Sequence, residues 1–377
     1  MARTLIVSPR RYETAVFRGG QVECEDVFCE VEGAHLVTPQ ARPRVSNNLT
    51  RKLQRASRRF LHLNVEPIAR PEPYTIQSNY DLLFVYAQRH EDLASLDYLR
   101  GLRRCAVKVC LVEELWARDL RRWGDKIIRR FDGFDVIAVG FQETAIELSK
   151  LTRTHCEWIP GAVDTLRFHP GKQPLPRTID VFSMGRRSDK THQALLNLSR
   201  QRDWLYLYDT YEPRGVVGGD HAMHRNQLAN LIQRSRYFIA NKARIGCDTE
   251  GQEELGYRSF EGAAAGALLI GDAPKSDAAR ALFDWPDAHV NLPFDSTDFA
   301  VQLLSDLDAN PARTAAIRSA NITQCLLRHD WAYRWQSLLS AVGLKPREPL
   351  QRRLDFLREL ADAPHRQEPV RRRCVTP

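Results

Sequence analysis

Two glutamates eight positions apart carry the clearest chemical signal in this sequence of 377 residues. Glu253 falls in a predicted loop, and Glu261 falls one turn into a predicted helix that begins at 256–259. Free amides at the N-terminus of a helix attract phosphate, and a carboxylate one turn further on can accept two hydrogen bonds from a ribose diol. A carboxylate in the preceding loop would reach whatever hangs from the phosphates. On spacing alone no ligand is required, because such glutamate pairs are common.

The elements that must position these glutamates are short apolar runs that alternate with amphipathic ones. In the first half, strands are predicted at 82–86, 107–112, 135–139 and 156–159, and helices at 93–102, 116–128 and 144–151. In the second half, strands are predicted at 179–183, 204–208, 237–240 and 267–270, and helices at 191–198, 226–232 and 257–265. This alternation indicates parallel sheets covered on both faces. We therefore predict an α/β protein with two doubly wound, Rossmann-like domains and a ligand crevice at the carboxyl ends of the strands.

A proline-rich segment separates the two halves. Residues 168–177 hold three prolines and a glycine, which is typical of a domain boundary. Beyond Pro293 the pattern becomes all helical, at 297–307, 312–327, 331–342 and 350–360, and Asp330 is expected to cap the helix that begins at Trp331. The predicted organisation is a first domain at 1–168, a linker at 169–178, a second domain at 179–330, C-terminal helices at 331–362 and a disordered basic tail at 363–377.

Three stretches, in order along the chain, resemble the retaining GT-B glycosyltransferases, especially glycosyltransferase family 4 and its group-1 relatives. Residues 158–170 are similar to the interdomain signature of that family, and residues 181–190 to its strand, Gly-Arg loop and Lys. Residues 253–272 match its Glu, seven residues, Glu, and the Ala/Gly-rich stretch before a buried strand. The resemblance implies the GT-B fold, in which two Rossmann-like domains face a cleft and C-terminal helices cross back to the first domain.

The resemblance also implies roles for the matching residues. Glu261 would bind the donor ribose, and Glu253 would contact hydroxyls of the transferred sugar. Arg186 and Lys190 would neutralise the departing diphosphate, because fixed cations aimed at developing charge lower a barrier; Glu253, Lys190 and Arg186 are thus the expected catalytic residues. The family usually spaces this Arg and Lys one residue further apart, so Arg187 is an equal candidate for the phosphate ligand. A solvated loop would explain either cation alone. The remaining expected donor contacts are Gly185, Gly256, Tyr257, Arg258 and Ser259.

The acceptor side carries a weaker signal. The Gly-rich loop that the family places after its first strand is missing, and Gly19-Gly20 is a poor substitute for it. His90 and Glu113 follow predicted strands at their carboxyl ends, which makes them candidate contacts from the first domain. A lone histidine in a loop is more often a polar surface residue, so His90 has that simpler explanation as well.

Charge is unevenly distributed over a chain whose net charge is +8. Residues 42–70 hold eight Lys or Arg against one acid, Glu66, and such a field suits polyanions or anionic lipid. A helix at 48–62 would place Leu49, Leu53 and Phe60 on one face, as a membrane-surface helix does. An ordinary domain helix with a solvated basic face has the same pattern. No motif of interleaved aromatic and basic residues supports a specific nucleic-acid partner.

Location and function follow from these observations together. The longest uncharged apolar stretch, 262–271, is shorter than the roughly 20 residues of a membrane span, and no signal-peptide pattern opens the chain. We therefore expect a cytoplasmic protein with possible peripheral contact at the inner membrane surface. The leading interpretation is a retaining glycosyltransferase that needs no metal or cofactor, with a nucleoside-diphosphate sugar as substrate and a glycan, lipid-linked or other anionic acceptor. The alternatives are an epimerase or phosphorylase of the same fold, and an inactive GT-B-like binding scaffold.

Overall fold

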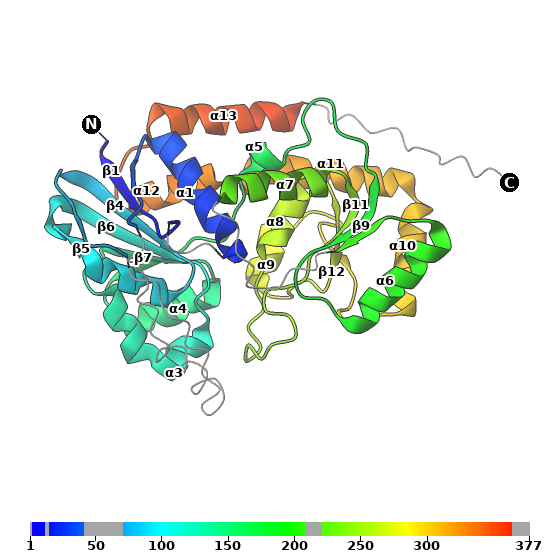
Figure 1. Ribbon diagram of the computed structural model, residues 1–377, viewed down its shortest axis with the longest axis horizontal. Coiled ribbons are helices and arrows are strands. Elements are labelled where there is room, and N and C mark those ends of the chain that lie inside the picture. The colour runs from blue at the N-terminus through cyan, green and yellow to red at the C-terminus, as the bar shows by residue number, and fades with distance from the viewer. Residues whose placement is uncertain (1, 12–14, 41–70, 209–219, 364–377) are drawn as a thin grey trace.

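The computed structural model describes residues 2–11, 15–40, 71–208 and 220–363. These residues form two α/β halves side by side, with α13 (Glu348–Asp362) running across the top of both (Figure 1). The predicted basic helix at 48–62 and the tail from 364 onward lie outside the described residues.

The first half is built on a six-stranded parallel sheet in the order β2-β1-β4-β6-β7-β8. Its members are β1 (Thr4–Val7), β2 (His35–Val37), β4 (Tyr80–Ala87), β6 (Cys105–Val112), β7 (Val136–Val139) and β8 (His155–Trp158). Because all neighbours are parallel, their carboxyl ends share one edge. The chain reverses its direction of winding between β1 and β4, and that edge is where such sheets bind ligands.

Helices cover both faces of this sheet. They are η1 (Val16–Arg18), α1 (Gly19–Glu32), η2 (His90–Tyr98), η3 (Leu102–Arg104), α3 (Ala117–Ile128), η4 (Arg129–Phe131) and α4 (Gln142–Leu151). The helices predicted at 116–128 and 144–151 are confirmed. The hydrophobic pattern predicts no helix at 19–32, because α1 buries Gln21, Glu23 and Glu25 together with its apolar residues.

The helix predicted at 93–102 is wrong. The segment folds as the 3₁₀ helix η2, followed by β5 (Leu99–Arg100), which pairs with β3 (Tyr74–Thr75). Only Leu93 of η2 is buried, so no apolar stripe holds an α-helix against the sheet. Gly101 then turns the chain at φ +82°, where a Cβ would lie 2.9 Å from the carbonyl oxygen of Ile76.

The second half repeats the architecture with a five-stranded parallel sheet in the order β10-β9-β11-β12-β13. Its strands are β9 (Ile179–Ser183), β10 (Tyr206–Tyr208), β11 (Ser235–Ile239), β12 (Leu268–Gly271) and β13 (Val290–Asn291). The accompanying helices are α5 (Thr165–Phe168), α6 (Asp189–Arg202), α7 (His221–Gln233), α8 (Tyr257–Ala264), α9 (Asp277–Leu282) and α10 (Asp298–Asp308). The winding reverses between β9 and β11.

The C-terminal helices return to the first half, as predicted. They are α11 (Pro311–Arg328), α12 (Trp331–Ala341) and α13. Trp335 of α12 packs on Phe28 of α1, with ring centroids 4.5 Å apart, and shares a core with Phe84 of β4. Asp330 caps α12 as expected, because its carboxylate accepts a hydrogen bond from the amide of Ala332 at 2.9 Å. Together these features confirm the predicted fold class.

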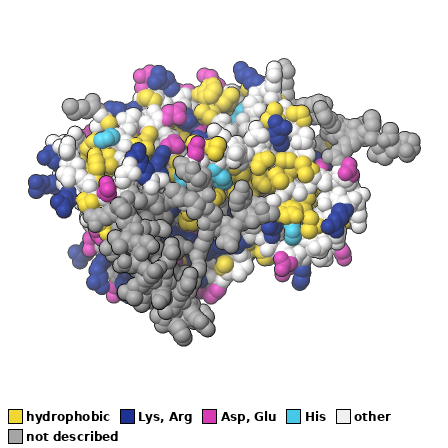
Figure 2. Space-filling view, in the orientation of Figure 1, with side chains coloured by type: hydrophobic (Ala, Val, Ile, Leu, Met, Phe, Trp, Pro, Cys, Tyr) yellow, Lys and Arg dark blue, Asp and Glu magenta, His cyan; other side chains and the backbone are white. Residues whose placement is uncertain are grey.

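On one face of the described surface, charge is not simply divided between the halves (Figure 2). On the face shown in Figure 2, Lys and Arg side chains are spread over the described surface and lie among Asp and Glu. Within the part of the chain that the structure describes, no helix has the length and apolar character needed to cross a membrane.

Candidate functional site

The helix α8 begins at the domain interface, where the sequence predicts a phosphate-binding N-terminus. Gly256 is its N-cap, in an extended conformation, and Ser259 bonds back to the Gly256 carbonyl at 3.1 Å. Small residues let this helix lie close to the sheet, as predicted: a Cβ at Gly262 would come within 2.6 Å of the Phe238 ring. The first turn of α8 is thereby held at the carboxyl edge of the second sheet.

The Gly-Arg loop after β9 meets this first turn. Gly185 has φ +87° and lies directly against the guanidinium of Arg258, so any side chain there would collide with it. Arg186 and Lys190 are exposed, whereas Arg187 is partly buried with its guanidinium 5.2 Å from the centre of the Tyr208 ring. The structure therefore brings Gly185, which directly precedes Arg186 and Arg187, against Arg258 at the point where the sheet reverses its winding.

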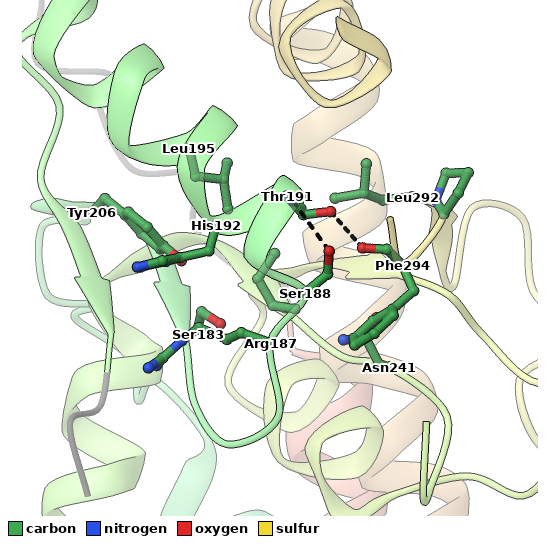
Figure 3. Close-up of a pocket in the computed structure, with 12 residues that line it drawn as sticks. Ser183, Arg187, Ser188, Thr191, His192, Leu195, Tyr206, Asn241, Leu292 and Phe294 are labelled. Atoms are coloured by element: carbon green, nitrogen blue, oxygen red, sulfur yellow. Dashed lines mark hydrogen bonds between the residues drawn. The ribbon is translucent and has the colours of Figure 1, made fainter. Parts of the chain in front are cut away.

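A small pocket opens at the same edge of the second sheet (Figure 3). Arg187 lines it together with the rings of His192 and Tyr206, which are joined by a 2.9 Å contact between Nδ1 and the hydroxyl. Ser188, the N-cap of α6, accepts a hydrogen bond from the amide of Thr191 and donates one to Asp295. The pocket thus lies beside a helix N-terminus and one of the loop cations.

Glu253 lies in the loop before α8, within reach of two cationic or amide donors. Its Oε1 accepts a hydrogen bond from Nζ of Lys242 at 2.5 Å, and its Oε2 accepts one from the amide of Lys275 at 2.7 Å. Partial burial opposes ionisation, but these two donors outweigh it and lower the pKa of Glu253. Asp272 lies 3.5 Å from the same Lys242 Nζ. Glu253 is consequently a fixed, ionised hydrogen-bond acceptor at the carboxyl ends of β11 and β12.

Glu261 is buried and does not face solvent directly. Its Oε1 pairs with Nη1 of Arg225, from α7. The same guanidinium bonds Glu23 of α1 through Nε at 2.8 Å and Nη2 at 3.2 Å. The carboxylate expected to hold ribose is therefore joined to the first domain through one arginine.

A second link between the domains starts at Tyr257, the first residue of α8. Its hydroxyl lies 2.6 Å from that of Tyr86, which donates to Glu113 at 2.7 Å. The Tyr257 ring lies against Gly20, where a Cβ would come within 2.7 Å of it. Burial raises the pKa of Glu113 to about 7, although the hydrogen bond from Tyr86 works against this. Burial also raises the pKa of both tyrosines well above its usual value.

Of the two candidate first-domain contacts, only Glu113 lies at the domain interface. His90 begins η2 and lies beside Glu91, with Nδ1 and Oε2 3.4 Å apart. Burial lowers the pKa of His90, and the other charges that influence it, Asp92, Asp119 and Arg130, also belong to the first domain. The loop after β1, where the family has glycines, is occupied by Arg10, which pairs with Glu25 of α1 at 2.9 Å.

The loop before α8 also docks on the first domain. Arg244 pairs with Glu114 at 2.7 Å and lies over the Trp116 ring, and Gln252 accepts a hydrogen bond from the amide of Ala117 at 2.9 Å. Gln252 in turn donates to Glu254 at 2.8 Å, whose pKa burial raises to about 7. The donor-motif segment is therefore held from both domains.

The sequence patterns do not point to several residues of this site. Arg225 lies in a helix whose predicted range, 226–232, starts one residue after it, and Glu23 lies in a segment with no predicted helix. Lys242 could have been suspected, since it follows a predicted strand at its carboxyl end. Among the described residues, no group of three or more His, Cys, Asp or Glu side chains is placed to hold a metal ion.

Comparisons with known proteins bear on the fold and on the second domain. A family described as glycosyl transferase-like matches residues 192–340, and no curated protein matches the sequence. The chain is similar to a UDP-forming α,α-trehalose-phosphate synthase from Burkholderia vietnamiensis, at 11% identity and a TM-score of 0.50 over 90% of this chain and 99% of that one. It is also similar to an α,α-trehalose 6-phosphate synthase from Burkholderia multivorans, at 13% identity and a TM-score of 0.50, over 91% and 99%.

These likenesses agree with the geometry. The two solved structures share the arrangement of two facing parallel α/β domains, and the matching family region runs from α6 into α12, across α7 and α8. The chain therefore has the GT-B fold, and its residues 192–340 match the family described as glycosyl transferase-like.

Proposed function

We propose that this chain is a retaining glycosyltransferase that transfers a sugar from a nucleoside-diphosphate sugar to a hydroxyl-bearing acceptor. The observation that carries the proposal is the contact between the loop after β9 and the start of α8. Arg258 of α8 lies against Gly185, and the exposed cations Arg186 and Lys190 follow Gly185 in the chain. A diphosphate bound there would face two cations and a helix N-terminus.

The chemistry asked of these groups is stabilisation of a leaving group. Transfer breaks the bond between the anomeric carbon and the diphosphate oxygen, and negative charge then grows on the diphosphate. Arg186, Lys190 and the amides of the first turn of α8 would stabilise that charge without moving, which lowers the barrier. Retention requires that the acceptor oxygen bond to the anomeric carbon from the face that the diphosphate leaves, and the proton of the acceptor hydroxyl then passes to the departing diphosphate.

The two glutamates would hold opposite ends of the donor. Glu253, kept ionised by Lys242 and the Lys275 amide, would accept hydrogen bonds from hydroxyls of the transferred sugar. Glu261 would accept the ribose diol, and no metal or cofactor takes part. The first domain, through the face that includes Glu113, would receive the acceptor.

Calorimetric titration of the full chain tests this proposal. We expect saturable binding of at least one of UDP, GDP and ADP, and a different affinity for the matching sugar nucleotide. The anomeric configuration of the sugar released or transferred, followed by NMR, tests retention. Failure of all three diphosphates and their sugar derivatives to bind would overturn the proposal and favour a scaffold.

The acceptor and the location are proposed more broadly. We expect a cytoplasmic chain whose basic segment 42–70 favours an anionic acceptor or an anionic membrane surface, since each Lys or Arg near such a surface contributes about 1 kcal/mol. Co-sedimentation with vesicles of anionic and of neutral lipid measures this. Equal, weak binding to both, with transfer unchanged when Arg51, Arg55 and Arg58 become Glu, would contradict it.

A further inference from the structure

Arg225 of α7 joins the donor-motif helix to the first domain. Its Nη1 pairs with Oε1 of Glu261, and its Nε and Nη2 bond the two oxygens of Glu23. The side chains of all three residues are almost fully buried, at 4%, 5% and 0% exposure for Arg225, Glu261 and Glu23. No residue of α7 belongs to the motifs from which the donor site is expected.

The surroundings hold this guanidinium in one orientation. The guanidinium lies 4.9 Å from the centre of the Phe168 ring, and a Cβ at Gly19 would come within 3.1 Å of Cδ of Arg225. Glu23 is itself fixed, because its Oε1 accepts a hydrogen bond from the amide of Asp164 at 2.8 Å. The paired carboxylates raise the pKa of Arg225 despite its burial, so the cation is permanent.

The pairing leaves Glu261 able to accept more hydrogen bonds. Two carboxylate oxygens offer about four acceptor positions, and Arg225 engages only Oε1 in this structure. A rotating carboxylate would present these positions in many directions, whereas one clamped by an arginine presents the remainder in one. Preorganised groups bind more tightly, since less freedom is lost on binding.

We propose that Arg225 is a positioning residue of the donor site: it orients the Glu261 carboxylate toward the ribose diol and ties that orientation to the first domain through Glu23. This inference rests on the proposed function and deepens it. It implies that binding of the nucleoside part of the donor depends on the first domain, through Glu23. Ribose is therefore distinguished from sugars without the diol only while Arg225 is in place.

The test compares nucleotides that differ only in the diol. Calorimetric titration gives the ratio of dissociation constants for the best-binding nucleoside diphosphate and its 2′,3′-dideoxy counterpart. Hydrogen bonds to a charged group predict a wild-type ratio of roughly tenfold or more. Arg225→Gln should reduce the ratio to near one and leave the affinity for the dideoxy compound unchanged. A merely structural arginine would alter both affinities alike.

A second variant guards against misfolding of the first. Glu23→Gln keeps the volume and an acceptor for the Asp164 amide but withdraws the interdomain charge, and Arg225 still balances Glu261. We expect it to lower the ratio by roughly two- to fivefold, the worth of one weakened hydrogen bond. Arg236→Gln is the matched control: that arginine also bridges two carboxylates, Asp180 and Asp308, but within the second domain.

Each outcome has a definite meaning. A lowered ratio in Glu23→Gln, with the wild-type ratio in Arg236→Gln, supports the inference even if Arg225→Gln does not fold. A wild-type ratio in Glu23→Gln and in a folded Arg225→Gln overturns the inference and leaves the proposed function standing. If the wild-type chain binds none of the nucleoside diphosphates, both are overturned.

Discussion

Two pairs of cations in this molecule have opposite surroundings. Arg225 and Arg353 are buried between carboxylates: Arg353 Nη2 lies 2.6 Å from Asp164 and 2.8 Å from Asp330. Arg186 and Lys190, in contrast, are exposed at the carboxyl end of β9. The first pair of cations joins segments from both domains, and the second pair stands at an open edge.

This difference in burial distinguishes cations that are compensated within the protein from cations that are available to a ligand. A buried cation must be compensated within the protein, because an unpaired buried charge is very costly. An exposed cation needs no such compensation and contributes little to stability. Substitution of Arg353 should therefore change mainly stability, whereas substitution of Arg186 or Lys190 should change mainly ligand affinity.

The largest expected effect is on stability, from Arg353→Met. This substitution removes the salt bridge of buried Asp330 and leaves Asp164 with Arg167 at 3.3 Å, and breaking a buried pair typically costs about 3–5 kcal/mol. Chemical denaturation should show that loss in the free energy of unfolding. Arg358→Met on the same helix removes an exposed pair with Asp355 and should change stability by less than about 0.5 kcal/mol. Equal effects of the two variants would contradict the distinction.

Nucleotide affinity should respond next, to Lys190→Ala and Arg186→Ala. Each removes a cation from the proposed diphosphate site, worth about 1.5–3 kcal/mol in binding, with little change in thermal stability. Calorimetric titration with the best-binding nucleoside diphosphate measures the effect. Arg200→Ala, an exposed arginine near the other end of α6, is the control. Unchanged affinity in both loop variants would remove the diphosphate assignment.

The comparison also shows why much of the fold was predictable. Strands such as β4, β6 and β12 are buried on both faces, so their apolar runs are nearly continuous in the sequence. Helix α11 has a clear start, with Asn310 as N-cap and Pro311 in its first turn, and Asp330 caps α12. The 3₁₀ helix η2 defeats this reasoning, because long-range pairing of Leu99 with Tyr74 decides where it stops.

The site was only partly predictable for a related reason. The sequence segment 253–261 identifies a loop and a helix start, because those features are local. Arg225, Glu23 and Tyr86 act through contacts between residues far apart in the chain: 202 positions separate Arg225 from Glu23. A buried ion pair leaves no local pattern in the sequence. In α1 the buried Glu23 also interrupts the apolar pattern from which a helix would be predicted. Pairing partners of this kind emerge only when the domains are assembled.

Glu253→Gln should affect the sugar and not the nucleotide. The substitution keeps the shape but removes the charge that accepts from Lys242 and the Lys275 amide. We expect wild-type affinity for the nucleoside diphosphate and a loss of about 1.5 kcal/mol or more for the sugar nucleotide. Both titrations should be run in parallel with Glu250→Gln, an exposed glutamate of the same loop. A loss equal for both ligands would place Glu253 outside the sugar subsite.

A smaller effect concerns pH and the link between the domains. Burial raises the pKa of Glu113 from 4.5 to about 7. Between these two pH values the carboxyl group is protonated in the folded protein and ionised in the unfolded chain. The stability from this group is complete below pH 4.5 and is lost as the pH rises through about 7. Over that range we expect Glu113→Gln to remove about 1–3 kcal/mol of the fall in unfolding free energy. Glu359→Gln, an exposed glutamate on α13, should leave the profile unchanged. A profile unaltered by Glu113→Gln would contradict the prediction.

The smallest expected effect is that of a chelator on transfer. Glu253 and Asp272, the carboxylates at the two ends of the donor motif, share the ammonium group of Lys242 at 2.5 Å and 3.5 Å. Part of their charge is thus already compensated, whereas a divalent cation requires oxygen ligands free to receive it. In the proposed function, Arg186 and Lys190 would supply the positive charge that a metal would bring to a diphosphate. Initial rates of donor consumption should therefore be the same with and without EDTA. Loss of the rate in EDTA and its recovery with manganese would mean that Arg186 and Lys190 do not suffice to stabilise the diphosphate. That result would contradict the assignment of the exposed cations to ligand binding.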